Sequence, residues 1–125
     1  MDNKIRVMLV DDYVPIRKTF SAWLRGYPDM EIVGEAADGL EAVTLARNLF
    51  PDVILMDVNM PKMNGWEATK IITSELPKTC IIGLSINDDM ETVEAMKAAG
   101  AVSYFTKFCN LDNLLSAIRN FGSTI

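Results

Sequence analysis

The sequence contains no histidine at all. This absence excludes a histidine-based catalytic triad, a histidine metal site and a phosphohistidine on this chain. If phosphoryl chemistry passes through a histidine, that histidine must come from a partner. The two cysteines, Cys80 and Cys109, are too few and too far apart for a disulfide framework or a tetrahedral metal site. We interpret both as core thiols of a cytosolic protein.

Long apolar runs and an excess of positive charge are missing too. No stretch reaches the roughly 18 consecutive apolar residues that a membrane span needs, and the N-terminus lacks a signal-peptide pattern. The formal net charge is −5. Binding to nucleic acid or to an anionic membrane depends on lysine and arginine, so neither is expected of this chain by itself. We therefore expect a cytoplasmic protein without a membrane contact.

The chain does have the size and pattern of one α/β domain. Its 125 residues, half of them apolar, suffice for a real core. Strand-like runs are predicted at 5–10, 31–37, 53–57, 80–84 and 102–106. Helical patterns run from Pro15 to a stop at Gly26, from Asp38 to before Pro51, from Asn64 to before Pro77, from Asp88 or Asp89 to a stop at Gly100, and from Leu111 to before Gly122. This alternation predicts a parallel sheet with helices on both faces.

The stretch 51–65 carries the first functional signal. Its apolar run from Val53 to Met56 is typical of a strand buried on both faces, and the run ends in Asp57. In open α/β sheets, ligands bind at the carboxyl ends of the strands. A buried carboxylate is costly without partners. Taken alone, however, Asp57 can equally be a loop residue that has just reached solvent.

Polar residues also follow three other predicted strands: Asp11 and Asp12, Ser85, and Lys107. In a parallel sheet these ends share one edge, and four such ends are hard to explain as ordinary loops. Clustered acids raise each other's pKa unless a cation is present. Mg²⁺ favours one or two carboxylates together with water and phosphate oxygens. The set therefore predicts a half-site for Mg²⁺ and a phosphoryl group, with a carboxylate as nucleophile.

These residues closely resemble the receiver domains of two-component response regulators, from about residue 5 to residue 120. The matching motif residues are Asp11, Asp12, Asp57, Met60, Pro61, Gly65, Ser85 and Lys107. Stretches 6–12, 33–39 and 51–57 resemble the NarL/FixJ subgroup, whose outputs are LuxR-type helix-turn-helix domains. The resemblance implies a flavodoxin-like (βα)5 doubly wound sheet in the order 2-1-3-4-5. It also implies one receiver domain over residues 1–125, with any output domain absent from this chain.

The resemblance further implies a role for each residue of the site. Asp57 would accept a phosphoryl group from the phosphohistidine of a sensor histidine kinase. Mg²⁺ would be held by Asp12, Asp57 and the backbone carbonyl of Asn59, with Asp11 acting indirectly through water. Lys107 would pair with Asp57 at rest and with the phosphoryl group afterwards.

The switch residues implied by the resemblance are Ser85, which would move towards the phosphoryl oxygen, and Tyr104. Alternatively, Tyr104 has no switch role and is an ordinary aromatic residue of an edge strand. The chain would be a signalling switch rather than an enzyme, since it would catalyse only its own phosphorylation and dephosphorylation. Switching would control a homodimer or an output, and DNA would be bound only through a DNA-binding domain of a transcription regulator.

Two positions depart from the family pattern. Phe108 stands where proline commonly follows the lysine, which predicts either a trans bond after Lys107 or a strained cis bond. Ile86 stands after Ser85, where a small residue is usual. We expect this β-branched side chain to crowd attacking water and to slow the loss of phosphate.

Two other functions share part of this pattern. A haloacid dehalogenase-like hydrolase also forms an aspartyl phosphate, but it has an Asp-x-Asp pattern after strand 1 and a cap domain, whereas Asp11 and Asp12 are adjacent and no cap is present. The second alternative is a stand-alone or non-phosphorylated receiver-like interaction module. The intact set of acids, hydroxyl and lysine speaks against it, and a phosphorylation assay separates the three.

Overall fold

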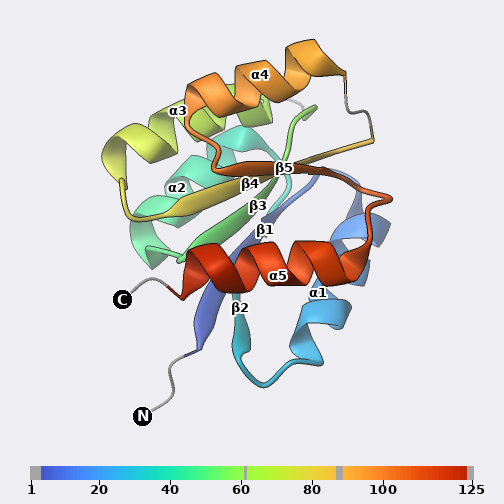
Figure 1. Cartoon of the computed structure of the whole chain (residues 1–125). Coiled ribbons are helices and arrows are strands. Elements are labelled where there is room, and N and C mark those ends of the chain that lie inside the picture. Colours follow the sequence, from blue (N-terminus) through green and yellow to red (C-terminus); the bar gives the residue numbers. More distant parts are fainter. Residues whose placement is uncertain (1–3, 61, 87–88, 124–125) are drawn as a thin grey trace.

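The computed structural model describes residues 4–60, 62–86 and 89–123 as five strands that alternate with five helices (Figure 1). The strands are β1 (Ile5–Val10), β2 (Met30–Ala36), β3 (Val53–Asp57), β4 (Cys80–Ser85) and β5 (Ser103–Thr106). The helices are α1 (Val14–Arg25), α2 (Gly39–Leu49), α3 (Gly65–Glu75), α4 (Met90–Ala99) and α5 (Leu111–Gly122). All strand pairs are parallel, in the order β2-β1-β3-β4-β5. The predicted (βα)5 fold and strand order are confirmed.

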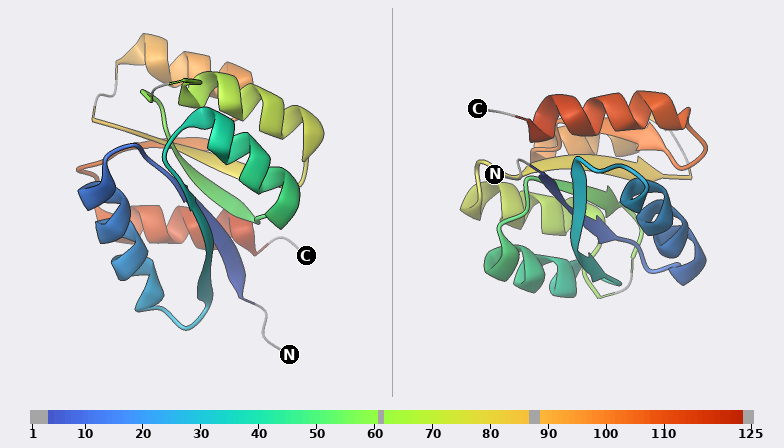
Figure 2. Two further views of the ribbon diagram at one scale, coloured as in Figure 1. Left: turned by 180° about the vertical axis from the view of Figure 1, so that it is seen from behind. Right: turned by 90° about the horizontal axis from the view of Figure 1, so that it is seen from below.

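The central strands bury side chains on both faces, because successive residues of a strand point to opposite sides. One core cluster takes Met8, Val10, Ile54 and Met56 together with residues of α2, α3 and α4. The other takes Val7, Leu9, Val53 and Leu55 together with residues of α1 and α5. Figure 2 shows the resulting three layers, with the sheet between the two groups of helices. Every residue of β3 is buried, as its apolar run predicted.

Side-chain caps begin four of the helices. The predicted caps Asp38, Asn64 and Asp89 each accept a hydrogen bond from a backbone N–H of the first turn. Asn110 caps α5 in the same way. The alternative cap Asp88 lies outside the described residues, as does Pro61 of the motif after β3.

Several predicted boundaries were wrong by one residue, including the start of α1 at Val14 and the end of β4 at Ser85. β2 is Met30–Ala36 rather than 31–37, because Met30 pairs with Ile5 at the start of β1. β5 is Ser103–Thr106 and excludes Val102. Gly122 is the last residue of α5 rather than the residue after it, and a Cβ there would overlap the side chain of Ile5. The missing side chain lets the end of α5 approach β1.

No helix within residues 4–60, 62–86 and 89–123 is long and apolar enough to cross a membrane.

Candidate functional site

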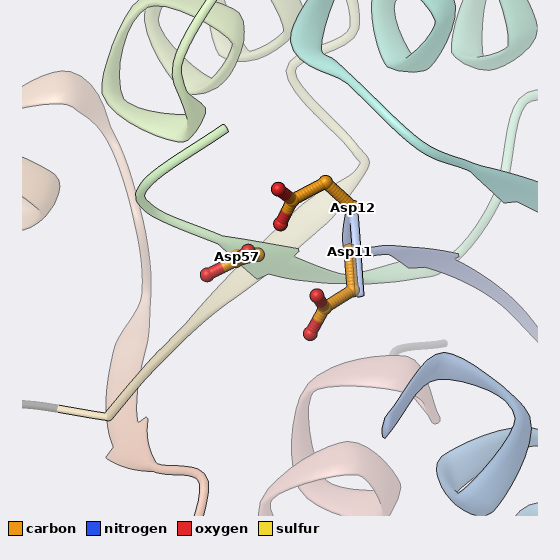
Figure 3. A group of neighbouring side chains, drawn as sticks. All are labelled: Asp11, Asp12 and Asp57. Carbon is orange, nitrogen blue, oxygen red and sulfur yellow. The ribbon is translucent and has the colours of Figure 1, made fainter. Parts of the chain in front are cut away.

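Three acids meet at the carboxyl edge of the sheet (Figure 3). Each of Asp11, Asp12 and Asp57 offers a carboxylate oxygen, and these oxygens lie within 4.8 Å of one another. The strands β1 and β3 that present them are neighbours in the sheet. Asp11 and Asp57 are buried, whereas Asp12 is exposed. The cluster is therefore reached from solvent on the side of Asp12.

Lys107 lies between the two buried acids. Its Nζ is 2.7 Å from Oδ2 of Asp11 and 3.3 Å from Oδ1 of Asp57, and its side chain is only 7% exposed. Burial by itself would lower the pKa of Lys107, but the hydrogen bonds and charges of Asp11 and Asp57 outweigh it and raise the pKa. The lysine therefore stays charged. The pairing with Asp57 was expected, but the shorter contact to Asp11 was not.

The surroundings of the Asp57 carboxyl make its ionisation unfavourable. Its burial, and then the charge of Asp11, raise its pKa from 3.8 to about 7, although Lys107 acts in the opposite direction. A carboxyl with this pKa is half protonated near neutral pH. A divalent cation beside it would favour the ionised form.

Ser85 completes the predicted set at the end of β4. It is buried, and its backbone carbonyl accepts a 2.8 Å hydrogen bond from the N–H of Lys107. That bond ties the loop after β5 to β4. The hydroxyl therefore lies on the strand next to β3, one residue beyond the register partner of Asp57.

The loop after β3 folds tightly back on the acid. Gly65 donates a 2.7 Å hydrogen bond to the carbonyl of Val58, and a Cβ on Gly65 would overlap the carbonyl oxygen of Asp57. Only glycine fits such an approach without a shift of the backbone. Asn59, the predicted carbonyl ligand, lies in this loop and is exposed.

Tyr104 and the two departures from the family pattern also lie on β5 or at the carboxyl edge. Tyr104 is half-buried and pairs in register with Gly83, where a Cβ would press on its ring. No peptide bond in the described part of the chain is cis, so the bond from Lys107 to Phe108 is trans. The side chain of Phe108 is 80% exposed and that of Ile86 is 59% exposed. Both therefore present apolar surface to solvent, directly after Lys107 and Ser85 in the chain.

One further residue near the cluster was not predicted. Arg17 in α1 donates a 2.6 Å hydrogen bond to the backbone carbonyl of Asp11 and is largely buried. A signal was available: Arg17 precedes the buried Phe20 and Leu24 by three and seven residues, which places it on the same helix face. A charge on that face needs a buried partner.

The donor set fits a hard divalent cation. All three side chains offer carboxylate oxygens, which Mg²⁺ prefers over nitrogen or sulfur ligands. Three acids cannot enclose an ion, so water and a phosphoryl oxygen would supply further ligands. The arrangement thus combines a carboxylate that could act as a nucleophile, acids that could hold a cation, a lysine and a hydroxyl, which together suit transfer of a phosphoryl group.

Comparison with known proteins gives one family. The family described as the response regulator receiver domain matches residues 7–119. The transcriptional regulatory protein LiaR of Bacillus subtilis is 46% identical over 115 residues, which are 92% of this chain and 54% of LiaR. The transcriptional regulatory protein DegU of Brevibacillus brevis is 38% identical over 118 residues, 94% of this chain and 50% of DegU. The chain spans about half the length of these curated relatives.

Solved structures show the same fold. The signal receiver domain of the response regulator NarL from Mycobacterium tuberculosis has a TM-score of 0.91 at 29% identity, over 98% of this chain and 99% of that one. The response regulator domain of Thermotoga maritima CheB has a TM-score of 0.85 at 38% identity, over 98% of each chain. A chain from the CheX-CheY-BeF3-Mg²⁺ complex of Borrelia burgdorferi has a TM-score of 0.85 at 25% identity, over 93% of this chain and 87% of that one.

Proposed function

Since the chain belongs to the response regulator receiver domain family of two-component systems, we propose that Asp57 is its phosphoacceptor. One observation carries the proposal. The carboxyl of Asp57 ends the fully buried central strand and lies within reach of two further acids and the Nζ of Lys107. Membership of the family supports the kind of chemistry, and the position of Asp57 in this cluster supports it as the residue that carries the chemistry.

Asp12, Asp57 and the backbone carbonyl of Asn59 would hold Mg²⁺, with Asp11 acting through water. Bound there, the ion would offset negative charge on the transferring phosphoryl oxygens. The exposure of Asp12 and the raised pKa of Asp57, caused by burial and then by the charge of Asp11, both favour a cation at this place. The complex of Borrelia burgdorferi CheY named above contains Mg²⁺ and BeF3, which supports the same ion here.

The transfer itself exchanges one bond for another. A carboxylate oxygen of Asp57 attacks the phosphorus of a phosphohistidine, the P–N bond breaks and the imidazole leaves. The absence of histidine from this chain requires that the donor be a partner, which we propose is a sensor histidine kinase. Lys107 then pairs with the phosphoryl group and Ser85 hydrogen-bonds one of its oxygens. The chain catalyses only this transfer and the later hydrolysis of its own acyl phosphate, in which water takes the phosphoryl group as inorganic phosphate and the Asp57 carboxylate is freed.

Phosphorylation would shift a two-state equilibrium of the domain. Ser85 moves towards the phosphoryl group, and Tyr104 responds on the face formed by α4, β5 and α5. This change promotes a homodimer or releases an output. The curated relatives are transcriptional regulators of about twice this length, so the proposed output is a DNA-binding domain outside residues 1–125. Cys80 and Cys109 are unpaired, which suits a reducing cytoplasm.

Intact-protein mass spectrometry tests the assignment. The parent chain, Asp57→Asn and the control Asp112→Asn, which changes an exposed acid of α5, are incubated with acetyl phosphate and Mg²⁺. We expect one added phosphate in the parent and the control and none in Asp57→Asn. A parent that gains nothing would instead support the non-phosphorylated interaction module. Turnover of small phosphate esters would support a hydrolase.

A further inference from the structure

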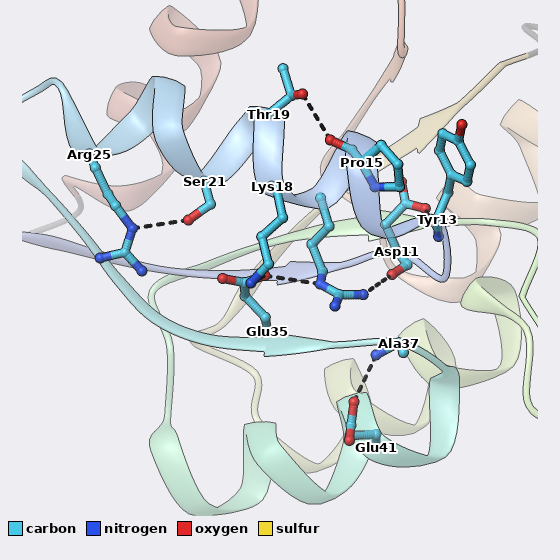
Figure 4. A network of polar contacts seen from close by, with 11 residues as sticks. Asp11, Tyr13, Pro15, Lys18, Thr19, Ser21, Arg25, Glu35, Ala37 and Glu41 are labelled. Carbon is cyan, nitrogen blue, oxygen red and sulfur yellow. Dashed lines mark hydrogen bonds and ion pairs between the residues drawn. The ribbon is translucent and has the colours of Figure 1, made fainter.

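Arg17 contacts both Asp11 of the acidic cluster and Glu35 of the edge strand β2. Figure 4 shows Asp11 and Glu35 within the network of polar contacts between α1, the end of β1 and β2. The Nη1 of Arg17 donates a 2.6 Å hydrogen bond to the backbone carbonyl of Asp11, and its Nε donates a 2.9 Å hydrogen bond to Oε1 of Glu35. Only 13% of the Arg17 side chain is exposed. One guanidinium therefore joins α1, the end of β1 and the strand β2.

The carbonyl that Arg17 holds belongs to the peptide unit between Asp11 and Asp12. Other groups of Asp11 are held separately: its backbone N–H donates to Ala36 at 3.0 Å, and its Oδ2 pairs with Lys107 at 2.7 Å. Holding the carbonyl fixes the direction in which the chain leaves β1. It therefore sets where the Asp12 carboxylate points.

The turn needs such a restraint because its acids repel each other. Without a cation, the repulsion between the carboxylates of Asp11, Asp12 and Asp57 becomes weaker if the turn opens towards solvent, so this repulsion favours the open turn. A hydrogen bond from a charged guanidinium to a carbonyl is among the stronger restraints available to a backbone. The short distance to the Asp11 carbonyl agrees with this.

Glu35 offsets the charge of Arg17. Burial would raise the pKa of Glu35, but hydrogen bonds from Arg17 and Lys18 outweigh burial and hold it below its usual range. Glu35 is thus ionised, and the pair adds little net charge beside the cluster. The effect of Arg17 on a cation is therefore mainly geometric.

We propose that Arg17 is a positioning residue of the Mg²⁺ site, which holds the peptide between Asp11 and Asp12 in its binding orientation before the ion arrives. The inference rests on the proposed function, since it takes the acidic cluster as the Mg²⁺ site. Without Arg17, the ion must first order the turn, and part of its binding free energy is spent on that ordering. Arg17 touches neither ion nor phosphoryl group in this role.

Isothermal titration with MgCl₂ tests the proposal on the whole chain, without any phosphodonor. Arg17→Met keeps an aliphatic side chain but removes both hydrogen bonds, and it should weaken Mg²⁺ affinity by about tenfold, as loss of an outer-sphere partner does elsewhere. Lys18→Met is the matched control. Lys18 also contacts Glu35, at 3.3 Å, but its side chain is 62% exposed, so affinity should stay within about twofold.

Arg17→Lys should recover only part of the affinity, because lysine keeps the charge but lacks the fork that reaches two acceptors at once. Thermal unfolding without Mg²⁺ distinguishes a positioning role of Arg17 from a purely structural one. If the role is purely structural, Arg17→Met should lower the melting temperature and leave the Mg²⁺ affinity unchanged. Unchanged or tighter Mg²⁺ binding by Arg17→Met overturns the inference alone. A parent that binds no Mg²⁺ overturns it together with the proposed function. If Arg17→Met does not fold, parent-like affinity of Arg17→Lys overturns it.

Discussion

At the scale of single residues, Asp57 experiences opposing forces. Its burial and its neighbour Asp11 disfavour the charged carboxylate, while Lys107 favours it. The first two prevail and raise the pKa of Asp57 to about 7, so below that pH the metal-free domain mostly keeps a proton that an aspartate in water would release. Such a carboxyl destabilises the fold when it is forced to ionise, which is the reverse of an ordinary surface acid.

Replacing Asp57 should therefore stabilise the metal-free domain most at high pH. The pKa of Asp57 is raised by burial and by Asp11 to about 7, from 3.8 when unfolded, so its destabilising effect is absent below pH 3.8, grows above it and is complete above pH 7. The gain in unfolding free energy of Asp57→Asn should be larger at pH 8 than at pH 5 by on the order of 2 kcal/mol. Urea unfolding in EDTA measures both values. An equal gain at the two pH values, judged beside Asp112→Asn, contradicts the assignment.

Ile86 is expected to govern how long the phosphoryl group persists. It follows the buried Ser85 directly and is itself 59% exposed, so we expect its β-branched side chain to obstruct attacking water. In Ile86→Ala the acyl phosphate should hydrolyse about threefold faster, equivalent to less than about 1 kcal/mol of barrier. The decay of the phosphorylated mass after removal of acetyl phosphate gives the rate. Val102→Ala, which trims another exposed β-branched side chain, is the control, and equal lifetimes in all three proteins would refute the shielding role.

At the scale of elements, the site depends on two short connections. The turn from β1 to α1 carries Asp11 and Asp12, and the loop from β3 to α3 brings Gly65 against the carbonyl of Asp57. Both connections are held by backbone hydrogen bonds, so the strands alone do not place the acids. Changes in these loops should alter the site while the sheet stays intact.

Gly65→Ala tests the second connection. Its Cβ would overlap the Asp57 carbonyl, a backbone atom that cannot give way alone, so we expect a loss of about 1–3 kcal/mol in unfolding free energy. Gly26→Ala is the matched control, since Gly26 ends α1 at φ −73° and its Cβ would lie 3.3 Å from the nearest atom, the carbonyl oxygen of Trp23. Urea unfolding compares the two. Similar losses in both variants would mean that the close approach at Gly65 is unimportant.

At the scale of the whole molecule, the sheet at the centre of the three layers connects the acidic cluster to the strand β5, which carries Tyr104. The register of β3, β4 and β5 places Asp57, Ser85 and Tyr104 on successive strands of one rigid sheet. We therefore expect a shift at the carboxyl edge to be transmitted across the packed layers, because such cores are not continuously deformable.

We expect phosphorylation to strengthen self-association. With acetyl phosphate and Mg²⁺, the dimer dissociation constant of the parent should fall at least about tenfold, which corresponds to 1.4 kcal/mol. Sedimentation velocity over a concentration series measures this, with Asp57→Asn as the protein that should not respond. If the chain is fully phosphorylated and its sedimentation is unchanged, the dimer prediction is wrong, and the switch would instead act on an output domain.

The alternation of strand-like and helical patterns along the chain was enough to predict the parallel α/β fold, and the polar residues after the strands were enough to predict that Asp11, Asp57 and Lys107 lie close together. The runs that became β1 and β3 are continuous in the chain, and the residues that follow such runs must meet at one edge of a parallel sheet. Local signals also located three caps correctly. The strand order came from the family resemblance, since alternation alone indicates only a parallel sheet.

The charged contacts and the exposure of individual side chains depend on the tertiary structure. Lys107 contacts Asp11, which lies far away in the chain. Whether a side chain is buried, as that of Arg17 is, or exposed, as Phe108 is, depends likewise on packing between distant segments. The ends of β2 and β5 depend in the same way on their pairing partners. Local pattern cannot encode these features, because each depends on distances that exist only once the sheet and its helices have packed.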